Sequence, residues 1–151
     1  FIEGRSYIGS ASRRLQGYKE ALLSAGMDID DTLIVPGDLS TSTGRESSLK
    51  LFSQPNPPSA IFASNDQSAL GTFEAAQELE LRIPEDLSIV GFDNITEAEY
   101  IGLTTVDQCL FEMGYIATQM LIDLVNGKQL DTDVYEVPTK LVIRRSCQKK
   151  E

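Results

Sequence analysis

Apolar residues along this chain recur at two spacings, and the two alternate. A spacing of three and four residues, typical of a helix with one buried face, occurs in four stretches. These stretches lie around residues 15–25, 49–52, 65–80 and 109–127. We expect Ser10 or Ser12 to cap the first helix and Gly26 to end it, while residues 40–42 precede the second.

Continuous apolar runs separate these stretches, as in strands that are covered on both faces. The runs lie at residues 32–35, 60–63 and 87–92, with shorter extended pieces at 104–106 and 140–143. Pro36-Gly37 ends the first run, and proline-containing breaks at residues 55–58 and 84 precede the other two. The alternation predicts an α/β fold, a parallel sheet with helices on both faces and right-handed crossovers.

Polar side chains follow the predicted strands directly, where ligands bind in open parallel sheets. They are Asp38, Asn65, Asp66, Asp93 and Asn94, with Leu39 among them and Arg14 just beyond the first strand. We expect all of them to face one crevice. Carboxylate, amide and guanidinium groups at fixed separation hydrogen-bond a polyhydroxylated ligand, and each unpaired group in such a site costs about 1–3 kcal/mol. The pattern thus predicts selective binding without catalysis.

The same residues have simpler interpretations. Asn65 and Asp93 are equally expected to cap a helix or a turn after a strand. For Arg14, helical spacing alone favours a solvated helix face.

Composition excludes several classes of function. The 151 residues suit one domain, and no apolar stretch approaches the roughly 20 residues that a membrane helix needs. A net charge of −10 repels a phosphate backbone, so we do not expect this chain by itself to bind DNA. With Cys109 and Cys147 outside any CxxC spacing and no histidine, we expect no metal and no cofactor, and reduced cytoplasmic thiols.

Enzymatic function is disfavoured by what the sequence lacks. It has no histidine to act as a general base and no GxSxG, P-loop or GxGxxG motif. A small hydrolase or kinase-like enzyme that uses Asp66 or Asp93 is the alternative, and we expect no catalytic residue.

Several motifs in order resemble the LacI/GalR family of bacterial repressors. They are Arg14-Leu15-Gln16-Gly17-Tyr18, Gly37-Asp38, Asn65-Asp66, the segment Pro84–Asn94, and Leu103-Thr104-Thr105-Val106-Asp107-Gln108. The resemblance extends over residues 1 to about 145. It implies the second, periplasmic-binding-protein-like lobe of an effector-binding domain in a cytoplasmic repressor, whose helix-turn-helix reads operator DNA outside this chain.

The resemblance also implies which residues meet the effector, expected to be a sugar or related metabolite. Arg14, Asn65 and Asp93 match family positions that contact effector, and Gln108 matches a position at the crossover. Leu39 stands where several relatives carry a Trp or Phe that stacks on the ligand, and this chain has no Trp. That departure puts a pyranose effector in doubt.

By the same resemblance, residues 1–108 and 134–151 form the lobe, and residues 109–133 form a helix and connection that pack on the first lobe. A stripe of Met113, Ile116, Met120 and Leu124 would lack its cover in this chain. We expect the helix to fold back, to swap, or to pair with another chain.

A homodimer is implied too, because family operators are symmetric. Leu70 and Tyr100 fall near pairing positions, although the spacing of Leu70 fits core packing equally well.

Two alternatives remain. A periplasmic sugar-transport protein would share the architecture, but the segments 84–94 and 103–106 favour the regulator.

The opening Phe1-Ile2, without a start methionine, suggests a fragment. The residues Ile2-Glu3-Gly4-Arg5 are either a protease-site scar or, as the resemblance favours, a native strand and turn.

Overall fold

A computed structural model describes residues 1–149 and shows a sheet built from six short extended segments. The named strands are β1 (Ala60–Phe62), β2 (Ser88–Val90), β3 (Thr105–Asp107) and β4 (Lys140–Val142). Single-residue bridges join Ile2 to Val35 on one side and to Ala63, next to β1, on the other. β1 pairs with β2, and bridges from β2 and the residues after it reach the β3 segment. These pairings are parallel, and only β4 runs antiparallel, beside β3.

The order of the segments across the sheet reverses direction at Ile2. The chain leaves Ile2, adds Val35 on one side, and then adds β1, β2 and β3 in turn on the other side. The expected parallel sheet is therefore confirmed. Its switch point lies between Ile2 and β1, where open parallel sheets leave a crevice at the carboxyl ends of the strands.

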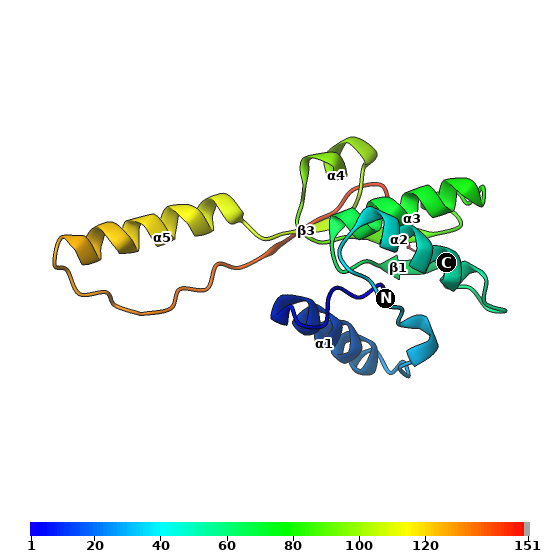
Figure 1. Cartoon of the computed structure of the whole chain (residues 1–151), viewed down its shortest axis with the longest axis horizontal. Helices are drawn as coiled ribbons and strands as arrows, with labels where there is room; N and C mark the ends of the chain where they lie inside the picture. Colours follow the sequence, from blue (N-terminus) through cyan, green and yellow to red (C-terminus); the bar gives the residue numbers. More distant parts are fainter. Residues whose placement is uncertain (150–151) are drawn as a thin grey trace.

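Helices cover both faces of this sheet (Figure 1). α1 (Gly9–Ser24) lies on one face, and α2 (Thr41–Phe52) and α3 (Asp66–Glu78) pack together on the other. α2 and α3 approach closely because Gly44 lies against the backbone of Ser68, where a Cβ atom would collide. The short α4 (Thr96–Ile101) connects β2 to β3.

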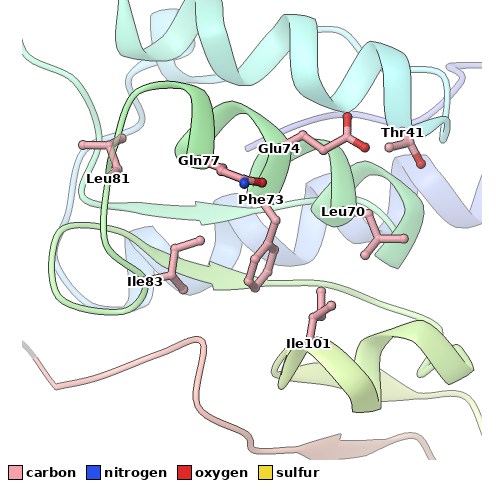
Figure 2. A pocket seen from close by; sticks show the side chains of 8 residues that line it. All are labelled: Thr41, Leu70, Phe73, Glu74, Gln77, Leu81, Ile83 and Ile101. Atoms are coloured by element: carbon pink, nitrogen blue, oxygen red, sulfur yellow. The ribbon is translucent and has the colours of Figure 1, made fainter.

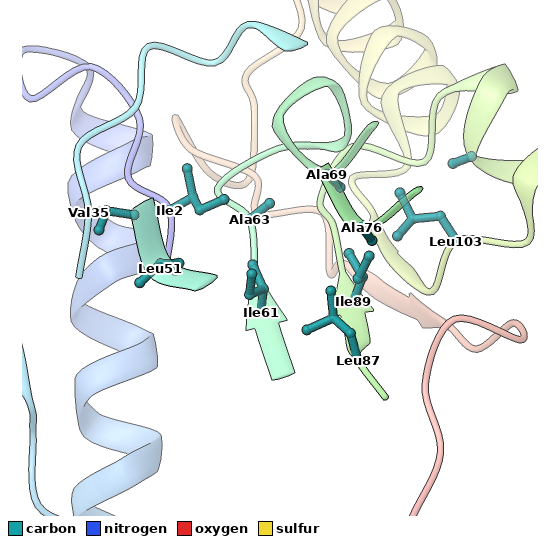
Figure 3. Packing of buried hydrophobic residues seen from close by; sticks show 11 residues of the cluster. Ile2, Val35, Leu51, Ile61, Ala63, Ala69, Ala76, Leu87, Ile89 and Leu103 are labelled. Carbon is teal, nitrogen blue, oxygen red and sulfur yellow. The ribbon is translucent and has the colours of Figure 1, made fainter. Parts of the chain in front are cut away.

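The hydrophobic core lies between the sheet and the α2–α3 layer (Figure 3). Ile61 and Ile89 in the central strands are 2% and 0% exposed. Leu51 of α2 and Ala69 and Ala76 of α3 pack against this cluster. The middle residue of each central strand is buried, and its neighbours Phe62, Ser88 and Val90 are half-buried, which is consistent with their mainly apolar runs.

A separate arm projects from this body (Figure 1). It contains α5 (Leu110–Val125), which has no buried residue, and the segment that returns to β4. Phe111 and Val125 are 88% and 79% exposed. The paired strands β3 and β4 form the joint between arm and body. None of the helices within residues 1–149 is both long and apolar enough to cross a membrane.

Two local predictions are wrong. Residues 32–35 do not form a strand, because Asp31–Leu33 is a 3-10 turn (η1) and only Val35 joins the sheet. The Asp30 carboxylate accepts hydrogen bonds from the Thr32 amide at 2.9 Å and its hydroxyl at 2.6 Å, which favours a turn over extended backbone.

Neither Ser10 nor Ser12 caps the first helix. α1 begins at Gly9 after Ile8, without a side-chain cap. Its end is as expected, since Gly26 has a φ of +71° that suits glycine.

Truncation of the buried Ile89 provides a test of this core. Ile89→Ala removes a fully buried side chain from the central strand, and we expect it to lower the free energy of unfolding in urea by about 2–5 kcal/mol. Ile143→Ala is the matched control, because Ile143 is 76% exposed and its truncation should change stability by less than about 0.5 kcal/mol. Equal effects of the two substitutions would contradict the assigned core.

Candidate ligand-binding cleft

The guanidinium of Arg14 joins three elements at the carboxyl end of the sheet. Arg14 lies on α1, and its Nη1 donates a hydrogen bond to the carbonyl of Ser64, just after β1, at 2.7 Å. The guanidinium carbon lies 3.8 Å from the centre of the Phe92 ring, which follows β2. Its Nη2 is 3.5 Å from Asp93 Oδ1. With 12% of the side chain exposed, Arg14 is held in the cleft and is not on a solvated helix face.

Asp93 faces Arg14 from a turn with unusual backbone geometry. Its φ is +122°, and its amide donates to the carbonyl of Val106 at 2.9 Å. Gln108 Nε2 donates to Asp93 Oδ1 at 2.6 Å. Within residues 1–149, the other carboxylate oxygen, Oδ2, accepts no hydrogen bond, while 26% of the side chain remains exposed. Asp93 therefore offers an acceptor to the cleft.

Burial dominates the electrostatics of this pair. It raises the pKa of Asp93, an effect that Arg14 opposes, the charge of Asp66 reinforces, and the hydrogen bond from Gln108 opposes. Burial also lowers the pKa of the Arg14 guanidinium, against the effects of Asp93 and Asp66. Perturbed pKa values of this kind are concentrated at functional sites.

Asn65 and Leu39 lie at the same edge but are bonded to each other. Asn65 Oδ1 accepts from the Ser68 amide at 3.0 Å and so caps α3. Its Nδ2 donates to the Leu39 carbonyl at 3.0 Å. Leu39 has a φ of +73°. The capping interpretation of Asn65 thus describes its contacts in this structure, and its amide holds the Leu39 turn beside the cleft.

The expectation that every polar residue after a strand faces one crevice is wrong for Asp66 and Asn94. Asp66 is fully buried, and its carboxylate bonds to Thr105 and Ile95. Asn94 donates to Asp107 Oδ2 at 3.2 Å and accepts from Arg144 at 2.8 Å. Asp38 instead orders the start of α2 by accepting from the Ser40 amide and hydroxyl.

Sequence reasoning missed two contacts of Arg14, the Phe92 ring and the Ser64 carbonyl. Phe92 was read only as the end of a buried strand, and a backbone carbonyl leaves no trace in residue type. Within the described part of the chain, no three His, Cys, Asp or Glu side chains are grouped to hold a metal ion.

A second feature is a groove of about 580 Å³ beside α3 and α4 (Figure 2). Leu70 and Phe73 of α3 and Ile101 of α4 line it, with Ile83 from the loop before β2. Leu70 lies at this groove and outside the buried core cluster. Tyr100 is 79% exposed on α4, next to Ile101.

Comparison with known proteins is consistent with this architecture. The periplasmic binding protein-like domain family matches residues 4–147. The HTH-type transcriptional repressor PurR of Proteus mirabilis is 40% identical over 147 residues, which are 96% of this chain and 43% of the repressor. Catabolite control protein A of Priestia megaterium is 34% identical over 137 residues, which are 89% of this chain and 41% of that protein. The chain thus spans less than half the length of these relatives.

Solved structures show the same likeness. A complex of the transcriptional regulator CelR with cellobiose superimposes with a TM-score of 0.85 at 33% identity, over 96% of this chain and 45% of that one. A sugar-binding LacI-family regulator from Escherichia coli, in complex with phosphate, gives 0.89 at 31% identity, over 97% and 53% of the two chains. These relatives are transcriptional regulators, which favours a regulator over a transport protein for this chain. The chain belongs to the periplasmic binding protein-like domain family, in the form found in the LacI-family transcriptional regulators.

Proposed function

We propose that this chain is the effector-binding part of a LacI-family repressor and binds a small polyhydroxylated metabolite, such as a sugar. The observation that carries the proposal is the Arg14–Asp93 pair at the switch point of the sheet. Arg14 donates hydrogen bonds, Asp93 accepts them, and Gln108 fixes the carboxylate. Such a set recognises adjacent hydroxyl groups without chemistry, so the function is binding and not catalysis.

The comparisons support this ligand class. One similar regulator was solved with cellobiose and another, described as sugar-binding, with phosphate. Leu39 beside the cleft carries no aromatic ring for stacking on a sugar face. Hydrogen bonds to Arg14, Asp93 and Gln108 would therefore carry most of the selectivity, with Asn65 and Leu39 shaping the edge.

We assign residues 1–108 and 134–151, of which 150–151 lie outside the described residues, to one lobe of the effector-binding domain and residues 109–133 to a segment that packs on another lobe. The exposed apolar side chains of α5 and the greater length of the relatives support this assignment. An effector in the cleft would then shift the equilibrium between two lobe arrangements that differ in affinity for operator DNA. The acidic chain itself does not bind DNA. A helix-turn-helix outside this chain, in a cytoplasmic regulator, recognises the operator.

A ligand screen by thermal shift tests the proposal on the full-length protein that carries this chain. Cellobiose, monosaccharides, nucleosides and phosphosugars serve as probes, since a ligand at 100 times its Kd stabilises by about 2.7 kcal/mol. We expect Asp93→Ala to weaken a hit roughly 5- to 150-fold, because an unpaired group in the site costs about 1–3 kcal/mol. Asp86→Ala, which removes a carboxylate paired with Arg82 outside the cleft, should leave binding unchanged. A ligand whose affinity is unchanged by Asp93→Ala would contradict the assigned cleft.

We further propose that the groove beside α3 and α4 pairs two copies of the protein. Its lining combines apolar side chains of both helices, Leu70 among them, and the exposed Tyr100 precedes the lining residue Ile101 on α4. Aromatic and aliphatic side chains around a hollow are typical of the centre of an interface. A two-fold dimer would also match a symmetric operator.

Sedimentation velocity of the full-length protein tests the pairing. Leu70→Asp would bury an unpaired carboxylate at the interface and should weaken the dimer roughly 100-fold or more. Leu79→Asp is the matched control, because Leu79 ends the same helix outside the groove and is 44% exposed. A Leu70→Asp protein that remains dimeric at the same concentration would exclude this groove.

A further inference from the structure

Asp66 is a fully buried carboxylate behind the cleft, and the proposed function gives it no role. It opens α3, and both of its oxygens accept hydrogen bonds. Oδ1 accepts from the Thr105 hydroxyl at 2.6 Å, and Oδ2 accepts from the Ile95 amide at 2.9 Å. Oδ1 also lies against Gly91, where a Cβ atom would collide with it. Asp66 thus ties α3 to β3 and to the chain beyond β2.

The two bonds hold the turn that carries Asp93. Asp93 and Asn94 have φ values of +122° and +57°, a region of backbone conformation that residues with side chains rarely adopt. Such a turn persists only when its surroundings fix it. The Asp93 amide is fixed on one side by the carbonyl of Val106. Ile95, on the other side, is fixed by Asp66.

The charge of Asp66 reaches the cleft as well. Both Asp66 and Asp93 act on the single guanidinium of Arg14. The negative charge of Asp66 also raises the pKa of Asp93, whereas Arg14 lowers it. Among residues 1–149, Asp66 forms no ion pair with Arg14, so its charge acts on the cleft without direct contact.

We infer that Asp66 is a positioning residue of the cleft, which holds the Asp93 turn in place through its bonds to Thr105 and Ile95. A turn held in this way keeps the Asp93 carboxylate available as an acceptor for a ligand hydroxyl. That Asp93 accepts a hydrogen bond from a ligand hydroxyl rests on the proposed function. The position of the turn and the effect of the Asp66 charge on the pKa of Asp93 do not rest on it, and both can be measured without ligand.

Carbon-13 NMR titration of the Asp93 carboxyl in the ligand-free protein tests the effect of the charge. The groups that face Asp93 are Arg14 from α1, Asp66 from α3 and the neutral Gln108 beyond β3. Asp66→Asn removes one negative charge, so we expect the pKa of Asp93 to fall. Asp86→Asn, which removes a carboxylate outside the cleft, should leave that pKa unchanged. An unchanged pKa of Asp93 in Asp66→Asn would contradict the effect of the Asp66 charge on Asp93.

Thr105→Val tests the positioning separately, because it keeps the side-chain shape and the charge while it removes the 2.6 Å hydrogen bond to Asp66 Oδ1 and a longer one, 3.4 Å, from the Asn94 amide to the Thr105 hydroxyl. We expect the Ile95 amide, which bonds to Asp66 Oδ2, to exchange on the order of ten-fold faster with solvent deuterium. The pKa of Asp93 should stay near that of the wild type. Unaltered exchange at Ile95 would overturn the positioning role, and this variant decides it even where Asp66→Asn does not fold.

Discussion

The position of the Arg14 guanidinium is the constraint on which the cleft depends. It is fixed by a backbone carbonyl after β1, an aromatic ring after β2 and the carboxylate of Asp93. These three partners come from separate segments that only the parallel sheet brings to one edge. Without Arg14, Asp93 would be a half-buried carboxylate with no cation beside it, which is costly in a protein interior. The strand order, the crossover through α1 and the polar residues at the edge of the sheet thus together fix the position of Arg14.

The turn at Asp93 and Asn94 connects this cleft to the joint of the α5 arm. The side-chain amide of Asn94 donates from Nδ2 to Asp107, on the chain that leads out to α5. Its Oδ1 accepts from Arg144, on the chain that returns after β4. Gln108, next along the outgoing chain, contacts Asp93. A strained turn therefore holds both connections at once, and strain of this kind is concentrated at functional sites. A ligand on Asp93 would act close to the point where the arm leaves the body.

The sequence predicted the regular parts of this arrangement and missed those set by local polar contacts. Continuous apolar runs identified β1 and β2, whose middle residues Ile61 and Ile89 lie in the core. The run at 32–35 is also mostly apolar, yet the Asp30 carboxylate holds Asp31–Leu33 in a 3-10 turn. Arg14, Asp93 and Gln108 do converge, whereas Asp66 points inward, because residue type at a strand end does not determine which way a carboxylate faces.

The central claim is that Asp93 is kept in the cleft for a ligand at some cost to stability, and the pH dependence of unfolding tests it most directly. Burial raises the pKa of Asp93 above its ordinary value, so the folded protein holds more protons than the unfolded chain in the range between the two values. Stability from this group is therefore lost as pH rises through that range. Comparing wild type with Asp93→Asn in the ligand-free protein from about pH 3 to about pH 7, we expect the free energy of unfolding of the variant to rise relative to wild type. A relative fall over the same range would contradict the account and show that Asp93 and Arg14 form a stabilising structural ion pair.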